Sequence, residues 1–118
     1  MAYSILLMRR TFYQTQLFSK KLDSRGGETL LLRIEEEILK NPEAGATVAG
    51  TGGVRKLRIE DPGRGKGKRG GFRVLFLDLT DRRETFLITF YGKDEADDIS
   101  AQAKKIISQI VEAIKAES

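Results

Sequence analysis

The chain has 118 residues, of which 40% are hydrophobic and 32% charged, and its formal net charge is +4. This length suits one domain with its own core, so we expect a single domain over residues 1–118. The absence of Cys and His excludes disulfides, thiolate nucleophiles and Cys/His zinc sites. An enzyme of this composition would depend on Lys, Arg, Tyr, Asp or Glu for proton transfer.

The N-terminal forty residues predict a short strand followed by a helical hairpin. Residues 3–8 are apolar and too few for a membrane span, so they are interpreted as a strand. From Thr11, which could cap a helix, residues recur at helical spacing until the SRGG segment at 24–27 interrupts them. Residues 28–40 then carry an apolar stripe, which predicts a second helix that ends before Asn41-Pro42.

Beyond residue 50 the pattern changes from helical to alternating. Residues 54–60 predict a strand that places Leu57 and Ile59 on one face and Lys56 and Arg58 on the other. Arg55 falls on the face of Leu57, at the end of that strand.

Two further strands and a helix complete the predicted elements. Residues 72–79 have apolar side chains at both parities, so both faces of this strand should be covered. A short turn links them to residues 84–91, which predicts an antiparallel hairpin. Residues 100–116 predict a helix capped by Ser100 or Asp98. We therefore expect an α+β fold: a small, mainly antiparallel sheet with an N-terminal helical hairpin and a C-terminal helix.

Positive charge is concentrated in one segment. Residues 55–73 contain eight basic and two acidic residues, a net charge of +6, whereas the rest of the chain has 13 basic and 15 acidic residues, a net charge of −2. Such an island indicates a polyanionic partner, although a loop that only aids solubility is the alternative. Its GKGKRG segment precedes a strand instead of joining a strand to a helix, so we do not interpret it as a dinucleotide site.

The predicted strands would gather several cations and a phenol on one face or edge of the sheet. These residue types suit the in-line cleavage of RNA. In that reaction Arg can neutralise the charge of the phosphorane, and a Lys or Tyr with a lowered pKa could deprotonate the 2′-hydroxyl or protonate the leaving oxygen. This chemistry needs no cofactor and no metal. The carboxylates ahead of the last helix could bind a divalent cation, but they are more typical of helix caps; they are Asp94, Glu95, Asp97 and Asp98.

Three ordered blocks closely resemble the HigB branch of the RelE-like toxins of type II toxin–antitoxin modules. They are GTGGVRKLRI, then KRGGFRV after a Gly/Lys/Arg loop, then FLITFYGKDEADDIS. The match is strongest over residues 42–100, and the first forty residues agree in layout only. The resemblance implies a microbial-RNase-like fold and a ribosome-dependent endoribonuclease that cleaves translated mRNA. It also implies a monomeric free toxin, inhibited by a cognate helix-turn-helix antitoxin similar to HigA. Since the sequence shows neither a signal-peptide pattern nor an apolar run of the ~20 residues that cross a bilayer, we expect a cytoplasmic protein.

The resemblance also implies roles for individual residues. The expected catalytic residues are Lys56, Arg58, Arg73, Tyr91 and Lys93, with Arg73 stabilising the transition state and Tyr91 near the nucleobase and the 2′-hydroxyl. The expected contacts to the RNA or ribosome backbone are Arg55, Arg64, Lys66, Lys68 and Arg69. Histidines that some HigB relatives use are absent. Two alternatives stay open: a gyrase inhibitor of the ParE branch, which should lack the Lys56, Arg58, Arg73 and Tyr91 set, and a non-catalytic RNA- or ribosome-binding module.

Overall fold

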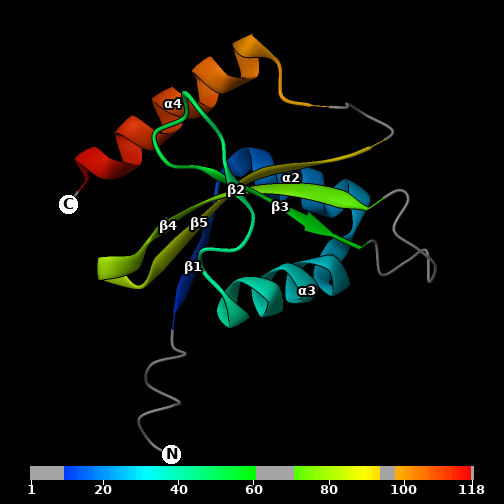
Figure 1. Ribbon diagram of the computed structural model, residues 1–118. Helices are drawn as coiled ribbons and strands as arrows, with labels where there is room; N and C mark the ends of the chain where they lie inside the picture. Colours follow the sequence, from blue (N-terminus) through cyan, green and yellow to red (C-terminus); the bar gives the residue numbers. More distant parts are fainter. Residues whose placement is uncertain (1–9, 61–70, 94–97, 118) are drawn as a thin grey trace, which may run out of the picture.

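A computed structural model describes residues 10–60, 71–93 and 98–117, and these form a mixed five-stranded sheet with helices on both of its faces (Figure 1). The predicted α+β class is confirmed. The elements in chain order are β1 (Thr11–Gln14), α2 (Gln16–Arg25), α3 (Gly27–Lys40), β2 (Ala46–Thr47), β3 (Arg55–Ile59), β4 (Phe72–Leu79), the 3-10 turn η1 (Thr80–Arg82), β5 (Glu84–Gly92) and α4 (Ala101–Ala116).

The predicted antiparallel neighbours form the centre of the sheet, whose strand order is β1-β5-β4-β3-β2. β4 pairs with β3 on one side and with β5 on the other, and both pairings are antiparallel. The turn between β4 and β5 is η1 followed by Arg83, whose φ of 54° lies in the left-handed region. The strand β2 extends the sheet beyond β3, and its two residues are too few to show a periodic pattern in the sequence.

The first helix does not begin at Thr11, and that prediction was wrong. Residues 11–14 form β1, which lies parallel to β5, and Thr15 caps α2 because its Oγ1 accepts a hydrogen bond of 3.1 Å from the Phe18 amide. Pairing with β5 outweighs the helical spacing, since Thr, Phe and Tyr at 11–13 suit a strand. The strand predicted over residues 3–8 lies outside the described residues.

Two apolar cores flank the sheet. Leu57 and Ile59 face the first core with α2 and α3, as the alternation along β3 predicted; its fully buried residues include Phe18, Leu30, Ile34, Ile38, Val74 and Phe90. The second core lies beneath α4 and includes Leu75, Leu77, Ile88, Ile107 and Val111. Because β4 contributes side chains to both cores, its covering on both faces is confirmed. Figure 1 shows α4 across the sheet from α3.

One residue of β5 interrupts the regular alternation. Leu75 pairs with Thr89 and Phe76 pairs with Leu87, so Ile88 is an extra residue with no partner on β4. Its carbonyl instead accepts a hydrogen bond of 2.6 Å from the Thr15 hydroxyl. The bulge and the start of α2 are therefore held by the same side chain.

A buried ion pair ties the chain entering β1 to the far end of β4. Arg10 donates to Asp78, and the side chains of the two residues are 9% and 5% exposed. The Asp78 carboxylate also accepts hydrogen bonds from the hydroxyls of Thr85, at 2.9 Å, and Thr80, at 2.7 Å. These contacts satisfy the buried carboxylate of Asp78 near the C-terminal end of β4.

None of the helices within the described ranges is long and apolar enough to span a bilayer.

We expect Asp78→Ala to lower the free energy of unfolding by about 3 kcal/mol or more, because it leaves the Arg10 guanidinium buried without its counter-charge. Asp81→Ala, at an exposed position in η1, is the matched control and should change stability by no more than about 0.5 kcal/mol. Urea unfolding followed by circular dichroism measures both. Equal losses in the two variants would contradict a stabilising role for this pair.

Candidate nucleic-acid interface

Three of the predicted site residues form a row across the sheet. Arg58 of β3 pairs with Arg73 of β4, and Arg73 pairs with Tyr91 of β5. Cross-strand partners lie ≈ 4.5–5.5 Å apart at Cβ and point to the same face. Tyr91 belongs to the core beneath α4, so the row lies on the α4 face of the sheet. The structure thus brings together three residues that are up to 33 positions apart in sequence (58 to 91).

The bulge at Ile88 is what places Tyr91 in this row. Phe86 and Ile88 face the core beneath α4, and strict alternation would send Phe90 there and Tyr91 to the opposite face. Because the bulge adds one residue, Phe90 enters the core under α2 and α3, and Tyr91 turns toward α4. Sequence alternation gave no signal for this change of face.

Lys56 lies on the same face, two positions from Arg58 along β3. It pairs with Leu75, and its Nζ lies 3.4 Å from Oδ1 of Asp98 in the segment that leads into α4. The Asp98 carboxylate also accepts a hydrogen bond of 2.7 Å from the Ile99 amide. These two contacts lower the pKa of Asp98, with the Ile99 amide the larger cause, and Lys104 adds to the effect.

Arg73 and Tyr91 each carry a buried polar atom without a hydrogen-bond partner in the part of the chain that the structure describes. These atoms are Nη1 of Arg73 and the hydroxyl oxygen of Tyr91. Buried polar groups in native proteins are nearly always paired, because an unpaired one forfeits its hydration. Two such donors on neighbouring strands make this part of the sheet a candidate site for a group that accepts hydrogen bonds.

Tyr91 is suited to donate a proton and not to accept one. Burial raises the pKa of its phenol above the ordinary value, the Asp98 carboxylate raises it further, and Arg73 opposes them with a smaller effect. The lowered pKa that we considered from the surrounding cations is therefore wrong for Tyr91. The residue stays protonated near neutral pH.

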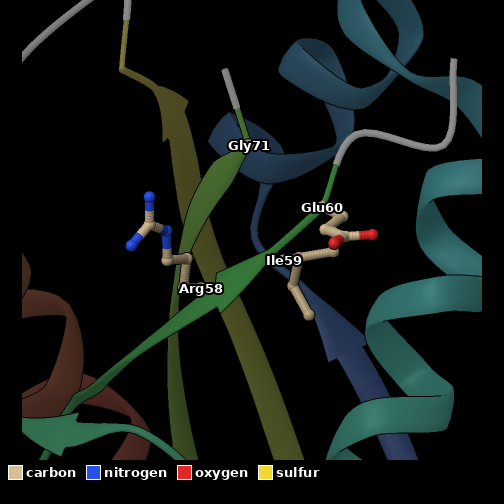
Figure 2. A pocket seen from close by; sticks show the side chains of 4 residues that line it. All are labelled: Arg58, Ile59, Glu60 and Gly71. Atoms are coloured by element: carbon tan, nitrogen blue, oxygen red, sulfur yellow. The ribbon is translucent and has the colours of Figure 1, made fainter. Parts of the chain in front are cut away.

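The open end of the sheet beside this row is hollowed. A pocket of about 200 Å³ lies where β3 ends and β4 begins, lined by Arg58, Ile59, Glu60 and Gly71. Figure 2 shows the Arg58 side chain leaving β3 on the opposite side from Ile59. Gly71 is required here, since a Cβ at this position would lie 2.6 Å from the Ile59 carbonyl oxygen. Because glycine has no Cβ, the backbones of residues 59 and 71 can approach closely.

A second, larger groove of about 430 Å³ opens beside Tyr91, between α2 and the start of α4. It combines an apolar floor with Lys21 on one side and Asp98 and Ser100 on another. Lys21 lies 5.9 Å above the ring of Phe90, and it is a residue that sequence reasoning missed. Its helical position among solvent-facing lysines gave no signal that α2 would bring it to this groove.

The remaining predicted residues are placed differently. Arg55 donates to the backbone carbonyls of Glu43, at 2.8 Å, and Gly45, at 3.1 Å, so its guanidinium braces the loop before β2. Lys93 follows β5 and is exposed. The predicted loop contacts lie outside the described residues; they are Arg64, Lys66, Lys68 and Arg69.

The acidic cluster ahead of α4 is described only at Asp98, because Asp94, Glu95 and Asp97 lie outside the described residues. The predicted capping of α4 is confirmed, since the Ser100 hydroxyl accepts a hydrogen bond of 3.1 Å from the Ala103 amide. No group of three or more carboxylates within the described ranges is arranged to hold a metal ion.

No protein-family model matches the chain.

We expect Tyr91 to titrate above the ordinary tyrosine pKa of about 10. Phenolate absorbance should show a late transition that Tyr91→Phe removes and Tyr13→Phe leaves in place. Asp98→Asn should lower the midpoint, and Arg73→Ala should raise it, because they remove opposing charges.

The same shift affects stability. Since the folded-state pKa is raised, the phenol contributes its full stabilisation below pH about 10 and loses it as the pH rises through the folded-state pKa. Circular dichroism at each pH separates titration from unfolding. A late transition that survives Tyr91→Phe would contradict the assignment.

Proposed function

We propose that this protein is a metal-independent endoribonuclease that cleaves translated mRNA on the ribosome, as the HigB branch of the RelE-like toxins does. The observation that supports this most directly is the row of Arg58, Arg73 and Tyr91, with the unpartnered buried donors of the last two. In this proposal the protein acts in the cytoplasm, and a helix-turn-helix antitoxin similar to HigA restrains it.

The row suits the charge that develops during in-line cleavage. The 2′-oxygen attacks the phosphorus and its proton passes to solvent, giving a phosphorane whose added negative charge sits on the non-bridging oxygens. Arg58 and Arg73 project from adjacent strands at one register and can donate to both of these oxygens. Fixed donors aimed at developing charge are the main source of catalysis in such a site.

Tyr91 suits the other half of the reaction. When the bond between phosphorus and the 5′-oxygen breaks, the leaving oxygen needs a proton, and a phenol with a raised pKa holds one at neutral pH. The products are a 2′,3′-cyclic phosphate and a free 5′-hydroxyl. The phenol must be regenerated from solvent before the next cleavage.

A basic surface beyond the row suits a long polyanion. Lys56 extends the cationic face along β3, and Lys21 brings positive charge from α2 to the groove beside Tyr91. This arrangement favours a strand of RNA over a single small anion.

We expect Arg73→Ala to slow cleavage by about 100-fold or more, because it removes a donor needed mainly in the transition state. Arg73→Lys should recover only part of the rate, since a single ammonium cannot reproduce the bidentate contact. Arg33→Ala, on the exposed side of α3, is the matched control and should cleave at the wild-type rate.

The measurement is primer extension on a reporter mRNA in a cell-free translation system, with and without ribosomes. Cuts in register with codons, present only with ribosomes and lost in Arg73→Ala, are the expected result. Binding to RNA without cuts would instead favour the non-catalytic module. Intact mRNA together with inhibited DNA supercoiling would favour a gyrase inhibitor of the ParE type.

A further inference from the structure

Asp98 forms an ion pair with Lys56. Lys56, Arg58 and Arg73 together make up the basic face of the sheet, on the side of α4. Oδ1 of Asp98 lies 3.4 Å from Nζ of Lys56, and the two side chains are 70% and 34% exposed. The contact joins β3 to the segment before α4 across 42 positions of sequence. A carboxylate thus lies where a phosphate oxygen would otherwise meet the Lys56 ammonium.

The position of this carboxylate is set by the start of α4. Asp98 accepts a hydrogen bond from the Ile99 amide at 2.7 Å, and Ser100 two residues later caps the helix. These local contacts do not need the negative charge, because an asparagine oxygen could accept the same hydrogen bond. Of the two hydrogen bonds that Asp98 accepts, the one from Lys56 is therefore the one that depends on the negative charge.

The ion pair is weak enough for a phosphate to replace it. Exposed pairs of this kind are worth little, because water and salt screen them and both side chains lose freedom. A phosphate group held at the same time by Arg58 and Arg73 would reach Lys56 with several charge-assisted contacts in place of one. A small anion that contacted Lys56 alone would not gain those additional contacts.

We propose that Asp98 masks Lys56 in the free protein and competes with the phosphate backbone of RNA for it. The mask lowers affinity for polyanions in general and is displaced by a backbone that also engages the neighbouring arginines. This inference rests on the proposed function in taking RNA as the natural polyanion.

Masking has a consequence for the dependence of binding on salt. A lysine that neutralises a phosphate of single-stranded RNA releases a counterion and contributes about 0.7 to the slope of log K against log salt. Lys56 and Asp98 together carry no net charge, so Lys56 contributes little to that slope while Asp98 remains beside it. Removing the carboxylate charge should restore the full contribution.

The test compares Asp98→Asn with Asp81→Asn, which changes the net charge equally at an exposed position in η1. The probe is a fluorescent single-stranded oligonucleotide with 2′-O-methyl riboses, which lacks the nucleophile and is not cut. Anisotropy between about 50 and about 200 mM salt gives affinity and slope. Elution from a heparin column gives a second measure that does not involve RNA, and thermal melting checks that each variant is folded.

We expect Asp98→Asn to bind the oligonucleotide about two- to fivefold more tightly at the lowest salt, with a slope steeper by about 0.7. It should also elute from heparin at higher salt than Asp81→Asn. In a Lys56→Ala background, Asp98→Asn should produce no larger gain than Asp81→Asn does, because the masked cation is absent.

Two results would overturn the masking. One is equal behaviour of Asp98→Asn and Asp81→Asn in both assays. The other is a gain from Asp98→Asn that persists in Lys56→Ala, which would show that Asp98 repels polyanions without acting through Lys56.

A heparin shift in a protein that neither binds nor cleaves RNA would refute the proposed function and leave the masking intact. Cleavage of mRNA with no difference between the two Asn variants would do the reverse.

Discussion

The extra residue at Ile88 is the constraint on which the candidate site depends. Without it, β5 would turn Tyr91 toward α2 and α3, and Phe90 would lie beside Arg73. The bulge reverses this order over one step, so that a large apolar ring fills the first core while the phenol reaches the row of arginines. Thr15 stabilises the arrangement, because its hydroxyl binds the Ile88 carbonyl while its Oγ1 also caps α2. A backbone irregularity, a helix start and the orientation of Tyr91 are thus coupled through one threonine.

The row itself has polar atoms where the sheet is otherwise apolar. Leu75 and Leu77 follow Arg73 on the same face of β4, and both are buried beneath α4. An arginine in that series leaves Nη1 buried without a partner among the described residues, a condition that lowers stability. The buried ion pair of Arg10 and Asp78, at the other end of β4, shows that the same fold can satisfy a buried charge fully. The contrast supports a functional reason for the unpaired donors at the open end.

The sequence predicted the elements that have a strong period and failed where pairing decides. Alternation along β3 correctly separated Lys56 and Arg58 from Leu57 and Ile59, because one face of that strand packs on a core. The same reasoning could not find β1, whose four residues gain strand structure only from their parallel pairing with β5. Nor could it place Lys21 or Asp98 beside Tyr91, since those contacts depend on where α2 and α4 cross the sheet. Residue type identified the chemistry, and long-range packing determined the geometry.

Asp98 connects the two halves of the proposed reaction. Its carboxylate contacts Lys56, which would hold the phosphate backbone, and its charge also raises the pKa of Tyr91, which would protonate the leaving oxygen. In the proposed exchange an incoming phosphate would take the place of the Asp98 carboxylate beside Lys56, and it would bring a negative charge of its own close to Arg73 and the phenol. Burial, the largest cause of the raised pKa of Tyr91, would keep the phenol protonated through such an exchange. The same exchange would free Lys56, so the proposed site would gain a phosphate contact and keep its proton donor.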